Sequence, residues 1–239
     1  MYVPSTFELS IVVACGFFWF YGWLSKKITG PTPRSGLRIK ISSPVFVSRY
    51  VSIVHSVTIS TLSVLYLTGV LPYEWWRVCQ CIPVGYCIYD TILVYGKTQL
   101  YLKVERVTPI HHFIFAVSSL WLFERYPLEV TVGYLAELSN PFLHISYHLL
   151  HTPHMKQYPR LFVFSSVALI ATFLVFRVGT FGYLLYRALF HESPGLFVVL
   201  GIGALFVMNV NWFWRLLRKA KYHLLPHILV SPENAPPRQ

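Results

Sequence analysis

Residues 107–123 read VTPIHHFIFAVSSLWLF, an apolar run that contains two adjacent histidines, His111 and His112. A run of this length and composition is typical of a membrane-spanning helix. Ionisable rings are costly inside a bilayer, so they need either partners or a polar space beside them. What surrounds this pair depends on how the rest of the chain crosses the membrane.

The composition of the whole chain indicates a polytopic membrane protein. Of its 239 residues, 55% are hydrophobic and 12% are charged, and the mean hydropathy is +0.53. Soluble domains carry about 25% charged residues, whereas apolar runs long enough to cross a bilayer recur along this chain. We expect seven spans, at about residues 8–24, 50–70, 77–96, 107–124, 127–150, 160–183 and 194–214.

Basic residues alternate between the predicted connections. Six fall in the first connection, three in the third and two in the fifth, whereas the second, fourth and sixth hold one each. The positive-inside rule then places the amino terminus in the lumen or outside the cell and the carboxyl terminus in the cytosol. We expect the net charge of +11 to face anionic lipid headgroups, and nucleic acid is not predicted as a partner.

Six polar residues fall at one depth within the predicted spans. At 1.5 Å per helical residue, each lies roughly 7–11 Å inside the predicted cytosolic boundary. Five different spans contribute them: His55, Asp90, His111, His112, His144 and Asn209. Because polar groups inside a membrane mark functional sites by default, this layer predicts a site within the bundle, provided that the side chains face one another.

The directions of these side chains limit the site. One face of the second predicted span is polar over about a third of its circumference and must face the bundle interior or a cavity. It carries Ser52, His55, Ser56 and Ser63. Adjacent helical residues point about 100° apart, so His111 and His112 can both border only a wide cavity. Otherwise one of them hydrogen-bonds a neighbouring helix.

The fifth predicted span contains a charge and a helix breaker. Pro141 follows Glu137 by four residues, so the carbonyl of Glu137 loses its usual helical donor and the helix should kink. The only intramembrane arginine, Arg177 in the sixth span, is the expected partner for this kink. We predict a Glu137–Arg177 pair with a structural role ahead of a catalytic one.

Four histidines could instead suggest a metal. Their spacing of four, three and three residues puts them on one helical stripe that runs out of the predicted membrane: His144, His148, His151 and His154. Pro153 disrupts the end of this stripe, and the HxxHH boxes of membrane di-iron oxygenases do not occur in the chain. We therefore predict interfacial histidines and no metal site.

Six segments in sequence resemble the TLC-domain family, which includes the ceramide synthases and several smaller lipid-homeostasis proteins. They are SRYVSIVHSVTIS, GYCIYDTILVYG, TPIHHFIFAVSS, LAELSNPFL, VFRVG and MNVNWFWRLLRK, and they cover about residues 48–220. The chain is most similar to the small seven-span TLC-domain-containing proteins. This resemblance implies that spans two to seven form a helical barrel around a lipid cavity, and it implies an endomembrane such as the endoplasmic reticulum.

The resemblance also implies roles for residues. In ceramide synthases the paired histidines are implicated in acyl transfer from acyl-CoA to a sphingoid amine, which corresponds here to His111 and His112, with Asp90 orienting the ring. The synthases carry further acidic residues on the helix after the pair, where this chain has Glu137, Ser139 and Asn140. That departure weakens the case for ceramide synthesis.

Three functions follow, in order of preference. The first is a lipid-homeostasis protein that binds acyl lipids in an intramembrane cavity without a cofactor. Its predicted lipid or headgroup contacts are His55, Ser56, Glu137, Ser139, Asn140, His144, Arg177 and Asn209. The second is an acyl-CoA-dependent acyltransferase, and the third is a membrane di-iron oxidase. Three regions are expected: an anchor helix with a basic loop over 1–45, a TLC domain over 46–220 and a disordered cytosolic tail over 221–239.

Overall fold

The computed structural model describes residues 6–28, 43–96, 108–152, 154–192 and 194–224. Every regular element within these ranges is helical. In chain order they are α1 (Thr6–Ile28), α2 (Ser43–Leu67), α3 (Tyr73–Cys79), α4 (Cys81–Gly96), α5 (Thr108–Leu122), α6 (Pro127–Tyr134), η2 (Leu135–Ser139), α7 (Asn140–Leu150), α8 (His154–Gln157), α9 (Pro159–Phe173), η3 (Leu174–Gly179), α10 (Thr180–Arg187), η4 (Ala188–Glu192) and α11 (Leu196–His223).

Within the described residues, four helices are long and apolar enough to cross a bilayer: Thr6–Lys27, Phe46–Leu67, Pro159–His191 and Leu196–His223. They coincide with the first, second, sixth and seventh spans predicted from the sequence. The third of these helices runs through α9, η3 and α10 and continues beyond the predicted end at residue 183. These four helices make the chain an integral membrane protein.

The other three predicted spans are helical but are not long unbroken rods. Residues 73–96 divide into α3 and α4, residues 127–150 divide into α6, η2 and α7, and α5 is short. Both breaks stand before a proline, Pro83 in the first case and Pro141 in the second. A proline removes a helical donor and clashes with the carbonyl four residues earlier. The sequence predicted seven spans with a kink at Pro141, whereas the interruption between α3 and α4 was not predicted.

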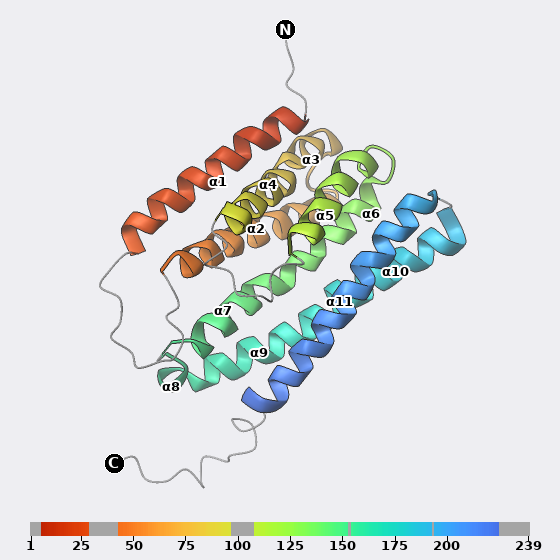
Figure 1. Cartoon of the computed structure of the whole chain (residues 1–239). Coiled ribbons are helices and arrows are strands. Elements are labelled where there is room, and N and C mark those ends of the chain that lie inside the picture. Colours follow the sequence, from red (N-terminus) through yellow and green to blue (C-terminus); the bar gives the residue numbers. More distant parts are fainter. Residues whose placement is uncertain (1–5, 29–42, 97–107, 153, 193, 225–239) are drawn as a thin grey trace, which may run out of the picture.

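Most of the basic residues of the described helices gather at one end of the bundle, although Arg77 of α3 and Arg187 of α10 lie toward the other. Figure 1 shows α1, α7 and α11 ending, and α2 and α9 beginning, at this end, whereas α3, α6 and the turn from α10 to α11 lie at the other. The first end carries Lys26, Lys27, Arg49, Arg160, Arg215 and Lys219. We call it the basic end, and the sequence predicts that it is cytosolic.

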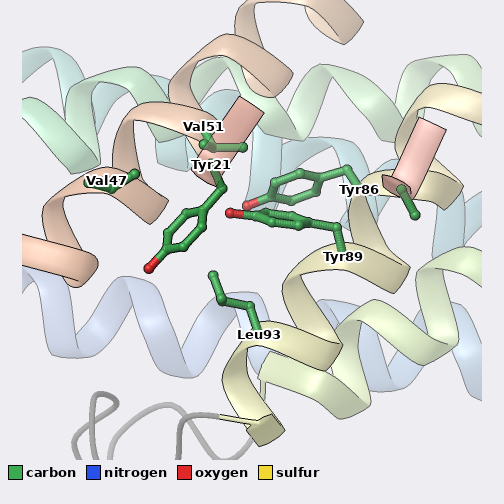
Figure 2. Packing of buried hydrophobic residues seen from close by; sticks show 7 residues of the cluster. Tyr21, Val47, Val51, Tyr86, Tyr89 and Leu93 are labelled. Atoms are coloured by element: carbon green, nitrogen blue, oxygen red, sulfur yellow. The ribbon is translucent and has the colours of Figure 1, made fainter. Parts of the chain in front are cut away.

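Helix α1 packs on the outside of α2 and α4. Its side chains Ala14 and Tyr21 join a buried cluster with Val47 and Val51 of α2 and with aromatic residues of α4, as Figure 2 shows. The approach is closest at Gly85, where a Cβ atom would stand 2.7 Å from the carbonyl oxygen of Ser10. Only glycine permits such an approach.

The interior away from the basic end is filled with aromatic side chains. Trp76 and Tyr134 are fully buried and pack with Phe123. The indole Nε1 of Trp76 donates to Thr131 Oγ1 at 2.7 Å, and the Tyr134 hydroxyl donates to Gln80 Oε1. These aromatic side chains form a buried cluster in this half of the bundle, whereas the predicted polar layer lies nearer the basic end.

Candidate functional site

A cavity of about 340 Å³ lies in the half of the bundle nearer the basic end. Its walls come from α2, α4, α5, η2, α7, α9, η3 and α11, and α1 contributes no lining residue. Eight of the predicted site residues line it: His55, Asp90, His111, His112, Glu137, Asn140, His144 and Arg177. Its volume is in the range of small-ligand pockets, about 300–1,000 Å³.

The predicted pair of Glu137 and Arg177 is present and is buried. Arg177 Nη2 lies 3.7 Å from Glu137 Oε1, and Asn140 bridges the two charges. Its amide nitrogen donates to Glu137 Oε2 at 2.5 Å, and its amide oxygen accepts from Arg177 Nη2 at 2.6 Å. A buried ion pair needs such additional hydrogen bonds to offset its desolvation.

Residues behind the cavity wall complete this arrangement. Ser56 donates to Glu137 Oε2 at 3.0 Å, Ser139 accepts from Arg177 Nε at 2.8 Å, and the side-chain oxygen of Asn209 lies 3.5 Å from Arg177 Nη1. These three were predicted as lipid contacts, but they are not among the lining residues. We call Ser56, Glu137, Ser139, Asn140 and Arg177 the carboxylate–guanidinium cluster.

Glu137 and Arg177 both lie in helical segments that are not α-helical. Glu137 lies in the 3-10 segment η2, where the backbone N–H of Asn140 donates to the Glu137 carbonyl. That bond satisfies the carbonyl that Pro141 deprives of its α-helical donor, so Arg177 is not needed there, contrary to the expectation from the sequence. Arg177 lies in the π-helical segment η3, and π-helical turns within α-helices occur frequently at functional sites.

His144 has a partner at each ring nitrogen. Arg49 Nη1 lies 3.1 Å from Nδ1, and Ser52 Oγ lies 2.8 Å from Nε2. A guanidinium only donates, so Nδ1 must accept and the ring is neutral with its proton on Nε2, which donates to Ser52. His144 is therefore held firmly in the cavity wall.

His55, unlike His144, has no hydrogen-bond partner at either ring nitrogen within the described residues. Its side chain is 2% exposed. The ring stacks on Tyr86 with 3.9 Å between centroids, and its Nδ1 lies 3.9 Å from Glu137 Oε2. Buried polar groups in folded proteins are nearly always bonded, so an unbonded one needs an explanation.

Both members of the histidine pair line the cavity. Their ring centroids are 5.6 Å apart, and Nδ1 of each ring is buried without a hydrogen-bond partner in the described part of the chain. His112 Nδ1 lies 3.5 Å from Asp90 Oδ2, and His111 meets the edge of Trp212. The cavity is thus wide enough for two side chains about 100° apart on α5. We call His55, His111 and His112 the imidazole cluster.

Sequence reasoning missed several lining residues. Tyr86 lies one helical turn before Asp90 on α4, and its hydroxyl donates to Ser52 at 2.9 Å. Arg215 and Lys219 were assigned only to the basic tail, yet both line the cavity. Their spacing of three and seven residues from Trp212 puts them on its face of α11, so periodicity could have found them.

A second, apolar crevice lies beyond Phe115, a residue that also lines the polar cavity. It holds about 70 Å³ between α5, α6, α10 and α11. Its lining includes Leu122, Val130, Phe181, Leu184, Val198, Ile202 and Leu205. The polar cavity therefore has an apolar neighbour on the side away from the basic end.

The four-histidine stripe does not form a ligand set. Helix α7 ends at Leu150, and His151 caps it through a contact of its Nδ1 with the Tyr147 carbonyl oxygen. His148 and His154 stack on each other at 5.7 Å. Among the described residues, no three His, Cys, Asp or Glu side chains are grouped so that they could hold a metal ion.

Comparison with models of known protein families agrees with the family resemblance of the six sequence segments. The TLC domain matches residues 45–218, which is well over half of the chain and includes every lining residue except Lys219. Neither a search of curated proteins nor a search of solved structures finds a match. On the breadth of that match, together with the apolar helices, this integral membrane protein belongs to the TLC-domain family.

Proposed function

We propose that the chain acts in membrane lipid homeostasis by binding an acyl lipid inside the bundle. The observation that carries this proposal is the polar cavity lined by His55, His111 and His112, whose rings hold four buried nitrogens without hydrogen-bond partners in the described residues. A ligand's polar group would supply the missing hydrogen bonds. A wholly apolar ligand would leave these bonds unmade, at a cost of about 1–3 kcal/mol per buried group.

The apolar crevice suits the tail of the same ligand. Phe115 borders both spaces, so an acyl chain that passes this ring would leave the polar cavity and enter an apolar lining. The ligand's polar group would then lie nearer the basic end, where lipid headgroups also lie. An amphipathic lipid satisfies both spaces, whereas a water-soluble metabolite would leave the crevice empty.

The proposal includes the predicted topology. Spans two to seven would surround the lipid as a barrel, because residues from each of these six segments line the cavity. The basic end would face the cytosol, as the positive-inside rule predicts, in the endoplasmic reticulum or another endomembrane. Glycosylation acceptor sites inserted at Gly69 and at the carboxyl terminus test the orientation. We expect modification at Gly69 alone, and modification at the carboxyl terminus would reverse the assignment.

Identification of the bound lipid tests the function. The full chain is purified in detergent, and the lipids that copurify are quantified by mass spectrometry against the total membrane. We expect one class of acyl lipid to be enriched at close to one molecule per chain. The variant Cys87→Phe, which adds a ring to the lining, should lose it.

Two control variants separate filling of the cavity from loss of the fold. Cys87→Ala removes the same buried thiol but leaves the space open, and Cys15→Phe adds the same ring at an exposed position on α1. Both should retain the lipid. If Cys87→Phe is folded and copurifies with the same lipids as the wild type, lipid is not bound in this cavity.

The Asp90–His112 contact supports a second candidate, an acyl-CoA-dependent acyltransferase. The carboxylate lies 3.5 Å from His112 Nδ1, so it would orient this ring rather than that of His111. His112 would take a proton from an amine or hydroxyl acceptor while that acceptor attacks the thioester carbonyl. The new amide or ester bond forms as the carbon–sulfur bond breaks, and the proton passes to the departing thiolate.

Labelled acyl-CoA tests this candidate. The purified chain is incubated with it and with a mixture of lipid amines and alcohols, and transfer is compared between wild type, His112→Ala and His111→Ala. We expect His112→Ala to lose transfer more completely, because only His112 has the carboxylate partner. If transfer by the wild type does not exceed transfer by the double variant His111→Ala/His112→Ala, the chain is not an acyltransferase in this assay. The proposal of lipid binding would be unaffected.

A further inference from the structure

The opening of the cavity is basic. Arg215 and Lys219 of α11 line the cavity and are also exposed on the surface, so they stand where the cavity meets its surroundings. Arg49 of α2 also lines the cavity, where its Nη1 donates to His144 Nδ1 at 3.1 Å. Lys219 lies one helical turn beyond Arg215 on the same face of α11, because residues four apart face the same way.

The charges of Arg215 and Lys219 are not paired with a carboxylate of the described residues. The lining carboxylates face other groups, with Asp90 beside His112 and Glu137 beside Arg177. The opening therefore carries a positive charge that an anionic ligand group can neutralise.

The geometry favours a phosphate over a carboxylate. Two exposed cationic side chains at the opening, with a third cation in the same lining, match a group with several acceptor oxygens and more than one negative charge. Arginine binds phosphate through two parallel hydrogen bonds. Trp212, which meets the edge of His111, lies three residues before Arg215, a rise of about 4.5 Å. A phosphate at Arg215 would thus stand about one helical turn outward from the imidazole cluster.

We propose that Arg215 and Lys219, with Arg49, form a phosphate-binding site at the opening of the cavity, so that its occupant is an acyl lipid with a phosphate-bearing head. This proposal rests on the proposed function and names the class of ligand. The phosphate comes either from a phospholipid headgroup or from the coenzyme A of an acyl thioester. Both present the same group to the same three side chains.

The experiment compares matched single-chain ligands on the full, delipidated protein in detergent micelles. Lysophosphatidic acid and oleoyl-CoA carry an oleoyl chain with phosphate, monooleoylglycerol carries the chain without charge, and oleate carries it with a carboxylate. Apparent affinity is taken from the rise in unfolding temperature with ligand concentration. We expect at least one phosphate ligand to bind at least about tenfold more tightly than both others, which is the effect of one charge-assisted hydrogen bond.

The same helix supplies the matched variants. Arg215→Gln/Lys219→Gln removes the proposed site, whereas Arg218→Gln/Lys221→Gln removes the same charge from exposed residues of α11 that do not line the cavity. We expect the first variant alone to lose the phosphate preference. Equal unliganded unfolding temperatures for both variants and the wild type would exclude a loss of fold as the cause.

The outcomes distinguish this proposal from the proposed function. Equal loss in both double variants would assign the preference to general surface charge and overturn the site. Equal binding of oleate or monooleoylglycerol would also overturn it, while lipid binding in the cavity would stand. If none of the four ligands binds, the proposed function fails as well. A preference for lysophosphatidic acid alone identifies a phospholipid, and one for oleoyl-CoA alone identifies a thioester.

Discussion

Two groups of buried polar side chains lie at the same cavity, in its lining or directly behind it, and differ in how their hydrogen bonds are satisfied. In the carboxylate–guanidinium cluster, Glu137 accepts from Ser56 and Asn140, and Arg177 donates to Ser139 and Asn140. In the imidazole cluster, four ring nitrogens of three histidines are buried without partners in the described residues. The first group is complete within the protein, and the second is not.

This difference divides the buried polar residues of the site into a group that stabilises the fold and a group that is available to a ligand. Removal of one partner from a saturated buried group leaves the others unpaired, which costs stability. Removal of a group that has no partner costs the fold little and deprives a ligand of its contacts. We therefore expect variants of the first cluster to act mainly on the stability of the protein and variants of the second mainly on ligand binding.

The largest loss of stability is expected for Arg177→Met. The change leaves Glu137 as a buried charge without its cation, and breaking a buried ion pair in this way costs about 3–5 kcal/mol. Unfolding in mixed micelles under increasing dodecyl sulfate measures the loss. The double variant Glu137→Gln/Arg177→Met removes both charges and should regain part of it. A double variant no more stable than Arg177→Met would contradict the pairing of these two side chains.

A smaller loss is expected for Asn140→Leu. The amide bridges Glu137 and Arg177. Its removal leaves Arg177 Nη2 without this acceptor, at about 1–3 kcal/mol, whereas Glu137 Oε2 still accepts from Ser56. The same unfolding assay measures it. Asn211→Leu, on an exposed position of α11, is the control and should change little. Equal effects of the two variants would show that the bridge does not stabilise the pair.

His144 extends the comparison to a histidine that is saturated. His144→Phe removes the acceptor of Arg49 and the donor to Ser52, although Tyr86 still donates to Ser52. We expect a loss of about 0.5–1.5 kcal/mol, the usual net value of a hydrogen bond. A change as small as that expected for the imidazole cluster would mean that the bonds of His144 do not hold the wall.

The sequence predicted eight of the residues that line the cavity, because polarity at membrane depth is a strong local signal. A histidine or an aspartate in an apolar run such as 107–123 has few explanations, and a count of residues from the boundary was enough to put His55, Asp90 and His144 in one layer. The pairing of Glu137 with Arg177 followed from the rarity of intramembrane charge.

The sequence could not separate lining residues from those behind them. Ser56 was assigned to lipid because its span turns a polar face inward, and Ser139 because it lies beside Glu137 in the segment that replaces the acidic residues of the synthases. Only the packing of η2 against α2 and η3 decides that these serines bond to Glu137 and Arg177. The breaks before Pro83 and Pro141 shortened the predicted spans for a similar reason. A hydropathy pattern does not report whether a proline only kinks a helix or ends it.

The smallest change in stability is expected for His55→Phe. Its comparison with Ser56→Ala tests the division between the two clusters most directly. The phenyl ring retains the stack on Tyr86 and lacks only the two nitrogens that have no partner in the described residues, so we expect the free energy of unfolding to change by less than about 1 kcal/mol. Binding of the copurifying lipid should weaken clearly, since that lipid is proposed to form hydrogen bonds with these nitrogens.

The variant Ser56→Ala, one residue along α2, removes the hydrogen bond to Glu137. It should lower the free energy of unfolding and leave lipid binding unchanged. If His55→Phe destabilises the protein more than Ser56→Ala and leaves lipid binding unchanged, His55 belongs to the structural cluster and the division between the two groups does not hold.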